Sequence, residues 1–202
     1  LGEVGGDDAL AALLAALPDP SPLVGAAAAT ALGRIGGQTA VEALVPLVFD
    51  VDETVVSAAQ TALRGLGQPG IEAALDGYCN TEGGRPETLM ALLSGADEAL
   101  LQRAFGLLSS VYPGVRVDAL VVLSELQCGS AGPAMASLLS DPEPSVARMA
   151  ARAVATLGDE GAAAIRLFLR ECSGAQRERA VRVLANETPQ SAGALLPLLA
   201  DD

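Results

Sequence analysis

Residues 19–50 decide the fold, and they read DPSPLVGAAAATALGRIGGQTAVEALVPLVFD. This stretch predicts a loop, a first helix, a glycine-rich turn and a second helix, with the next loop beginning at Asp50. In both helices the apolar residues recur at steps of three or four, which is the helical period. The residues predicted to face the core are Val24, Ala28, Ala31, Leu32 and Ile35 in the first helix and Val41, Leu44, Val45, Leu47 and Val48 in the second.

Local signals mark both ends of the first predicted helix. Asp19 and Ser21 can accept hydrogen bonds from the N–H groups that a helix start leaves unpaired, and Pro22 is tolerated in a first turn. Gly36 and Gly37 then end the helix, because glycine adopts a positive φ at little cost. One pair of such short helices cannot enclose a core, so neighbouring pairs must stack.

The unit recurs along the chain at intervals of about 30 residues, as short two-helix repeats do. The copies share one phase and carry Asp-Pro or Gly at the same points, which an Ala- and Leu-rich composition does not produce by chance. We therefore predict an all-α protein, an α-solenoid of stacked two-helix repeats. We expect about six repeats after a partial first repeat at residues 8–17, giving thirteen helices. The place of Val24 is taken in later copies by Val55, Arg85, Val115, Val146 and Gln176, and the loop acid Asp19 recurs as Asp50, Asp141 and Asp201.

This pattern resembles the HEAT-like repeats of the phycobilin-lyase type, which are two-helix repeats of about thirty residues. In that family an Arg directly follows the Val, and here only Val115-Arg116 keeps it, with Arg148 one place late in the next copy. The resemblance covers nearly the whole chain and implies a HEAT-like α-solenoid. It rests on the loop Asp, a Val five residues later and a small-x-x-Ala-Leu run that ends in Gly, namely Asp19, Val24, Ala28, Ala31, Leu32, Gly36 and their copies.

We expect a single HEAT-like domain over residues 1–202. Because the chain begins with Leu and stops in mid-pattern after Asp201, we expect it to be a fragment of a longer array. The repeat at about residues 80–110 is the irregular one, and the most obvious break in the pattern lies at its start.

Two features predict local departures from regular helix pairs. The segment NTEGGRP at 80–86 interrupts the pattern, and we expect a short helix over about 86–94 and a long one over about 97–110. Pro46 and Pro197 lie inside predicted second helices. A proline there removes a hydrogen bond, so we expect a bend or, alternatively, a groove beside the freed carbonyl.

The residue types argue against catalysis and against a bound metal. The chain has no His, which removes Ser-His-Asp and Cys-His catalysis in their usual forms. The acidic pairs lie in loops or at helix starts, where carboxylates favour the helix dipole, so we predict capping rather than acid–base catalysis. The acids at 50–53 lack calcium-loop spacing, and the cysteines lie too far apart for a disulfide. We therefore predict no catalytic residue, no cofactor and no metal site, and expect that the protein is not an enzyme. The pairs are Asp7-Asp8, Asp52-Glu53, Asp97-Glu98 and Asp159-Glu160, and the cysteines are Cys79, Cys128 and Cys172.

The net charge and the hydropathy of the chain limit the kinds of partner that it can bind. The formal net charge is −13, which repels phosphate, so we expect no nucleic-acid binding. No apolar run reaches the ~18–20 residues of a membrane span. All twelve basic residues are Arg, which we attribute to GC-rich coding. We expect an acidic bacterial protein of the cytoplasm.

These observations favour a non-catalytic scaffold or adaptor that binds protein partners. In arrays of the resembled kind the second helices line the concave face, which carries the candidate acids and two of the candidate Arg residues. Seven Arg fall within 144–182, and we expect this sector to dock an acidic partner surface or the acidic end of another copy. The resemblance also leaves open a lyase-type subunit or chaperone acting on a modified or pigment-bearing acceptor protein. The candidate partner-binding residues are Glu42, Glu72, Asp76, Tyr78, Arg148, Arg152, Arg166 and Arg170, each of which is alternatively an ordinary solvated side chain.

Overall fold

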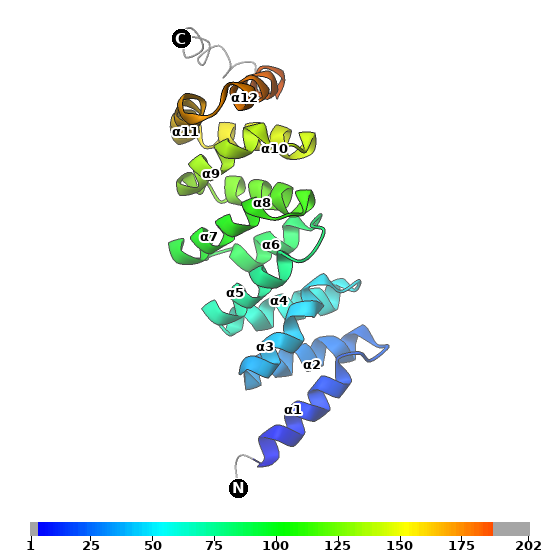
Figure 1. The fold of residues 1–202 in the computed structure, drawn as a ribbon. Coiled ribbons are helices and arrows are strands. Elements are labelled where there is room, and N and C mark those ends of the chain that lie inside the picture. Colours follow the sequence, from blue (N-terminus) through cyan, green and yellow to red (C-terminus); the bar gives the residue numbers. More distant parts are fainter. Residues whose placement is uncertain (1–3, 188–202) are drawn as a thin grey trace. The chain divides into compact units, whose positions relative to one another are not determined.

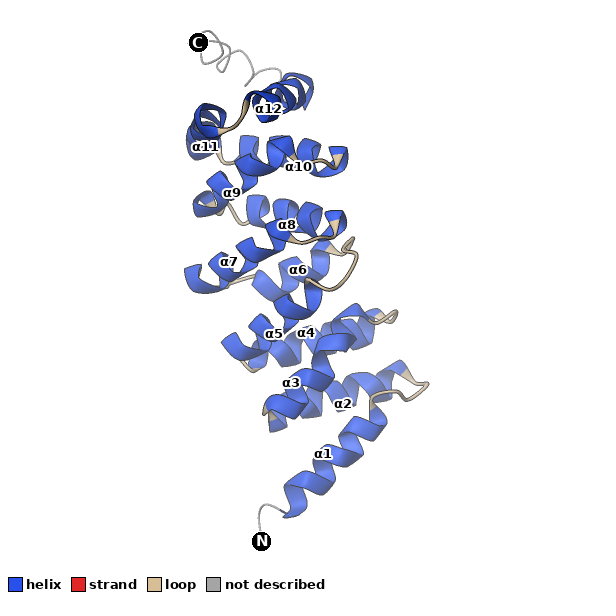
Figure 2. Ribbon diagram, in the orientation of Figure 1, coloured by secondary structure: helices blue, strands red, loops and turns tan. Residues whose placement is uncertain are grey.

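The computed structural model describes residues 4–187, with side chains described from residue 8 onward. Within this range every regular element is helical, and short 3-10 helices extend several of the α-helices (Figures 1 and 2). The predicted all-α solenoid of two-helix repeats is therefore confirmed. The α-helices are α1 (Val4–Ala16), α2 (Pro22–Ile35), α3 (Gln38–Leu44), α4 (Glu53–Gly65), α5 (Gln68–Tyr78), α6 (Pro86–Leu93), α7 (Glu98–Ala104), α8 (Pro113–Glu125), α9 (Gly132–Ser137), α10 (Pro144–Thr156), α11 (Gly158–Glu171) and α12 (Gly174–Glu187), and the 3-10 helices are η1 (Val45–Phe49), η2 (Phe105–Ser109), η3 (Gly129–Ala131) and η4 (Leu138–Ser140).

The helices follow the predicted order of repeats. First helices α2, α4, α6, α8 and α10 are each followed by a second helix, which is α3, α5, α7, α9 or α11. Helix α1 is the partial first repeat, and α12 is the first helix of the sixth repeat. The predicted thirteenth helix lies outside the described residues. The second helices α3, α7 and α9 each pass into a 3-10 segment before the next loop.

The chain divides into two compact units. Unit 1 comprises Leu1–Asn80 with Met90–Ala96, and unit 2 comprises Thr81–Leu89 with Asp97–Asp202. The boundary runs through α6, inside the repeat that the sequence predicts to be irregular. A single domain over the whole chain stays a prediction.

In unit 1 the first helices α2 and α4 approach closely. A Cβ atom built on Gly33 would lie 2.6 Å from the Cβ atom of Ala62, so a larger residue would push the two helices apart. Leu32, Leu44 and Leu63 are fully buried in the same core. Small residues on the facing helices thus let this aliphatic core close without aromatic side chains.

Two residues predicted to lie in the core of the first regular repeat are exposed. Val24 is 40% exposed and Ile35 is 47% exposed. The valines that take the place of Val24 in later copies, Val55, Val115 and Val146, are buried. Val24 and Ile35 occupy the first and last turns of α2. The helix before α2 is the single helix α1, whereas each later first helix follows a complete pair, so the ends of α2 are covered less.

The two helix-breaking signals act differently. Gly36 ends α2 as predicted, with φ of 72° and its N–H donating to the carbonyl of Leu32 at 2.9 Å. Pro46 does not bend an α-helix, because α3 already ends at Leu44 and the chain continues as the 3-10 helix η1. The i to i−4 hydrogen bonds of the α-helix stop near Pro46, because proline has no N–H group to donate. Pro197 lies outside the described residues.

Carboxylates cap helices at two of the predicted positions. Asp52 and Asp97 accept hydrogen bonds from backbone N–H groups in the first turns of α4 and α7, at 2.8 and 2.9 Å. Ser21 precedes α2 but makes no side-chain cap, and Asp19 instead accepts from the Ser21 N–H at 2.8 Å. The first acid of each of these two pairs therefore has the capping role that the sequence predicts.

The interruption at residues 80–86 is an ordered connection that closes onto α8. Gly83 and Gly114 form an isolated bridge, and a Cβ atom on Gly114 would lie 2.0 Å from a carbonyl oxygen of the segment. Asp118 of α8 is only 3% exposed and accepts hydrogen bonds from the N–H groups of Gly84 and Arg85, at 2.6 and 3.1 Å. Sequence reasoning missed this clamp, although an acid inside an apolar helix is a signal for one.

The remaining expectations concern the cysteines and the membrane. All three cysteines carry free thiols, and Cys128 is buried while Cys79 and Cys172 are half-buried. Between residues 4 and 187, none of the helices combines the length and the apolar character that crossing a bilayer requires.

Candidate functional site

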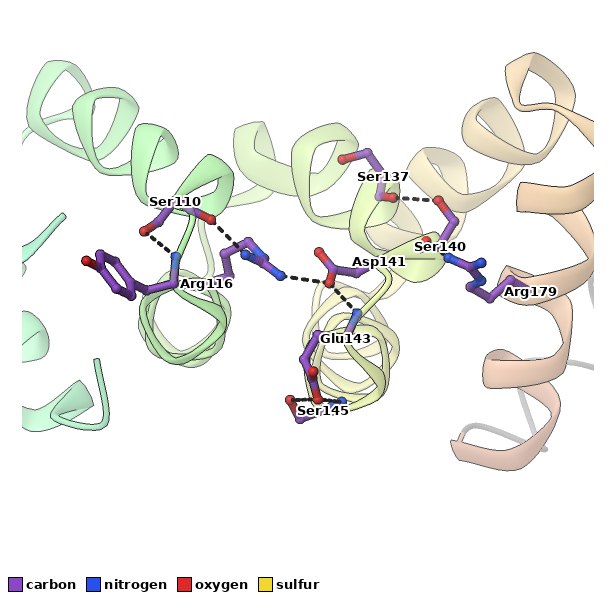
Figure 3. Close-up of polar contacts among 9 residues, drawn as sticks. Ser110, Arg116, Ser137, Ser140, Asp141, Glu143, Ser145 and Arg179 are labelled. Atoms are coloured by element: carbon purple, nitrogen blue, oxygen red, sulfur yellow. Dashed lines mark hydrogen bonds and ion pairs between the residues drawn. The ribbon is translucent and has the colours of Figure 1, made fainter. Parts of the chain in front are cut away.

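A buried ion pair joins two repeats of unit 2. Arg116 lies on α8 directly after Val115, and Asp141 lies in the loop that follows η4. The Arg116 Nη2 atom is 2.8 Å from the Asp141 Oδ1 atom, and the two side chains are 11% and 5% exposed (Figure 3). The pair forms at the one copy that keeps the Val-Arg sequence. Arg148, expected to replace such an arginine in the next copy, is exposed and makes no ion pair within the described residues.

Backbone groups hold both members of this pair in place. The Arg116 Nη1 atom donates to the carbonyl of Ser110 at 2.7 Å, at the end of the preceding repeat. The Asp141 Oδ1 atom also accepts from the Glu143 N–H at 2.9 Å, which is a local Asx-type turn. Figure 3 shows Arg116 between Ser110 and Asp141. The loop acid and the helix arginine therefore tie successive repeats through contacts that neither repeat can make alone.

A hollow of about 340 Å³ lies beside the ion pair, between the ends of η2 and η4. Three serines line its wall: Ser109 and Ser110 at the end of one second-helix segment, and Ser137 on the next. The two residues after Ser110 are exposed apolar side chains, because Val111 is 83% and Tyr112 is 38% exposed. The hollow thus has a polar floor, and two exposed apolar side chains follow its wall residue Ser110 in the sequence. Six of its lining residues are Leu108, Ser110, Arg116, Ser137, Asp141 and Pro142.

The floor of this hollow is electrically balanced but has unused hydrogen-bonding capacity. The Arg116 Nε atom is buried and has no hydrogen-bond partner among residues 4–187. Its terminal nitrogens each donate one hydrogen bond, although each carries two hydrogens. Of the two Asp141 carboxylate oxygens, only Oδ1 accepts a hydrogen bond from a described residue. A donor and an acceptor therefore lie next to each other at this site.

A second hollow, of about 440 Å³, lies between α9 and α11. Small residues on both helices leave this space, and Leu167 on its wall is 48% exposed. Helix α9 contributes to both hollows, through Pro133 on one side and Ser137 on the other. The lining includes Gly129, Pro133, Glu160, Ala163, Ala164 and Leu167.

The predicted acids lie on the second helices of unit 1. Glu42 on α3 is exposed and accepts from a Gln side chain four residues earlier at 2.9 Å, and Glu72 on α5 is half-buried with the same contact at the same distance. Asp76 is exposed. Tyr78 is fully buried, with its ring centroid 5.7 Å from that of Phe49, and we withdraw it as a surface residue. Its bulk fills the core where the helices carry mainly small side chains.

The predicted arginines divide into paired and unpaired groups. Arg166 and Arg170 are exposed on α11 and, within the described residues, make no hydrogen bond or ion pair. Arg152 is bound by Glu187 of α12, with 2.7 Å between Nη2 and Oε2. The charge of Arg152 is therefore neutralised by a neighbouring carboxylate, whereas the charges of Arg166 and Arg170 are not. Across the described part of the chain, no group of three or more Cys, Asp and Glu side chains is placed to hold a metal ion.

The chain was compared with family models, curated proteins and solved structures. A family model for HEAT repeats matches residues 1–64. Among curated proteins, none matches this chain significantly. One similar crystal structure, of an engineered protein, is 19% identical over 89% of this chain and 96% of its own, with a TM-score of 0.34. Another engineered protein is 21% identical with a TM-score of 0.36, and the match covers 94% of this chain but only 61% of that protein.

Proposed function

We propose that this protein is a non-catalytic scaffold that binds protein partners through the second-helix face of unit 2. We define this face as the side on which α7–η2, α9–η4 and α11 lie, and Figure 1 shows these segments in sequence order along one side of that unit. The observation that carries the proposal is the pair of hollows flanking α9. Two grooves between consecutive second helices give one continuous face two places where a partner can insert side chains.

The chemistry of the face also supports binding rather than catalysis. The carboxylate in the first hollow is held by Arg116 and by a backbone N–H, so it is not positioned as a free general base. Arg166 and Arg170 on α11 have unneutralised charge, which favours a partner with acidic groups. Of the two predicted arginines on the first helix α10, Arg152 is paired with Glu187, so only Arg148 adds exposed positive charge beside this face.

Differential capture tests the proposal. The protein and a blocked variant, Ser137→Phe with Leu167→Glu, are immobilised and exposed to extract of the source cells, and retained proteins are identified by mass spectrometry. The control is Ala155→Phe, which adds the same bulk at an exposed position of the first helix α10. We expect at least one protein that the parent and the control retain and the blocked variant loses. Identical sets on all three would contradict binding through this face.

The finer family assignment is part of the proposal. Repeats of the phycobilin-lyase type carry Arg after the Val, and the Val115-Arg116 copy has the ion pair to the loop Asp that this sequence pattern suggests. No contact in either hollow specifically favours a lyase or chaperone activity, so we do not extend the proposal to that alternative.

A further inference from the structure

The hydrogen-bonding groups in the hollow beside Arg116 match those of one particular side-chain group. We propose that it binds the carboxamide of a Gln or Asn side chain carried by the partner. The inference rests on the proposed function, because it names the group with which a partner would be anchored to the second-helix face. It concerns only this one hollow, and the groove between α9 and α11 is a separate feature.

The floor offers a donor beside an acceptor. Each terminal nitrogen of Arg116 has one unused hydrogen among the described residues, and these hydrogens are the donors that the floor offers. The Nε–H is also unpaired but is enclosed by protein atoms, so it reports on binding rather than contacting the ligand. Asp141 has an oxygen, Oδ2, that accepts nothing there. A primary carboxamide presents C=O and N–H along one edge, so its oxygen can accept from Arg116 while its nitrogen donates to Asp141. Unused capacity in such a buried place is costly, and a ligand that satisfies both groups removes that cost.

Charge selects against the two ionic alternatives. A carboxylate would be attracted by Arg116 and repelled by Asp141, and an ammonium group would meet the reverse situation. Their side chains are 11% and 5% exposed, so the surrounding protein screens these forces less than bulk water would. A neutral group with both functions is repelled by neither. The local balance of the ion pair therefore favours an amide over an acid or an amine.

The rim suggests what surrounds the carboxamide. The hydroxyl of Ser137 already donates to the carbonyl of Ala134 at 2.7 Å, so it has no donor left for the carboxamide and Ser137 shapes the mouth only by its size. Val111 and Tyr112, next to the wall residue Ser110, are exposed and apolar. An apolar neighbour of the anchoring residue can pack on them. The volume of about 340 Å³ is large enough for a carboxamide together with its methylene stem.

Small probes isolate the anchoring group from the rest of a partner. Propionamide, propionate and propan-1-amine share a three-carbon skeleton and differ in the head group. Each is titrated into ¹⁵N-labelled protein, and the Arg116 Nε–H and the backbone N–H signals of Ser110 and Glu143 are followed by NMR. The Arg116 signal is identified by its disappearance in Arg116→Lys.

We expect propionamide to give saturable shifts at these three signals, with a Kd between about 1 and 100 mM, as befits five heavy atoms. Propionate and propan-1-amine should bind at least about tenfold more weakly, which is about 1.4 kcal/mol. Ser137→Phe, at an exposed position on the wall, should abolish the propionamide shifts, and Ser137→Ala, which leaves the hollow open, should keep them.

Three outcomes overturn the proposal. They are an absence of saturable shifts with propionamide, tighter binding of propionate or of the amine, and unchanged shifts in Ser137→Phe. If propionamide fails while the blocked variant still loses a partner in the capture experiment, the carboxamide anchor is wrong and the scaffold function stands. If propionamide binds and no partner is ever lost, the hollow is a genuine amide site and the scaffold function fails.

Discussion

Removing the carboxylate of Asp141 tests whether the ion pair between repeats stabilises unit 2. In Asp141→Ala the guanidinium of Arg116, a residue only 9% exposed, keeps its hydrogen bond to the Ser110 carbonyl and loses its counter-charge. Breaking a buried pair in this way costs about 3–5 kcal/mol. The Glu143 N–H also loses its acceptor, which adds about 1 kcal/mol, but water can enter the adjoining hollow and offset part of the loss. We therefore expect the free energy of unfolding to fall by about 3 kcal/mol.

The assay is urea denaturation followed by circular dichroism, combined with amide hydrogen exchange. Exchange is needed because repeat arrays need not unfold in one step, and it locates the loss. We expect faster exchange in α8, η4 and the start of α10. Glu125→Ala is the control, since Glu125 is an exposed acid on α8, and its effect should stay within about 0.5 kcal/mol. An Asp141→Ala protein within about 0.5 kcal/mol of the parent would refute the reasoning.

Salt separates this pair from an exposed one. The Arg152–Glu187 pair has an arginine that is 63% exposed, so its contribution should be below about 1 kcal/mol and should vanish at about 1 M salt. The cost of Asp141→Ala should persist at that ionic strength, because the pair is enclosed by protein. Loss of the effect in high salt would mean that the ion pair opens to solvent.

Four further variants test other parts of the structure. Asp118→Ala removes the acceptor of two backbone N–H groups of the 80–86 segment and should cost about 1–3 kcal/mol, with increased hydrogen exchange in that segment as the measurement. Gly33→Leu forces a side chain into α4, where even a Cβ atom would meet a neighbour at 2.6 Å, and should cost more than about 2 kcal/mol in urea denaturation. In contrast, Gly65→Ala, where nothing lies within 4 Å, should be neutral or slightly stabilising. Arg166→Glu with Arg170→Glu should weaken capture of an acidic partner and flatten its salt dependence, while unfolding free energy changes by less than about 1 kcal/mol. Unchanged binding would show that these arginines form only a solvated face.

The repeat architecture was predictable because it depends on periodicity. Apolar residues at helical spacing, glycine at one helix end and Asp-Pro in the loop are local signals that each copy repeats. The errors arise where the environment is not the average one. Val24 fits the pattern and is exposed, since its helix follows only α1. Tyr78 has the polar tip expected of a surface residue and is buried, since a core of small residues leaves room for one ring.

The candidate site was predictable only in part. Arg116 was identified from its place after Val115, and Asp141 as a loop acid, but their distance could not be read from spacing alone. The hollow depends on where two successive second helices end, and these ends are set by the change from α-helix to 3-10 helix at η2 and η4. Ser110 and Ser137 follow no period that distinguishes them from other serines. A hollow that forms where two repeats meet therefore cannot be predicted from the sequence pattern of either repeat alone.

Stability and recognition should be separable at this ion pair. Replacing both charges with apolar groups of similar size, as in Arg116→Met with Asp141→Leu, removes the desolvation cost together with the attraction, and such exchanges are often neutral or stabilising by about 1–4 kcal/mol. The Glu143 N–H and the Ser110 carbonyl still lose their partners, so we expect the double variant to stay within about 1 kcal/mol of the parent and to unfold less easily than Asp141→Ala. It should nevertheless lose the propionamide shifts at Ser110 and Glu143, because the hollow then has neither the donor nor the acceptor. If the pair exists only to join repeats, the double variant should retain amide binding, and that result would remove recognition from its role.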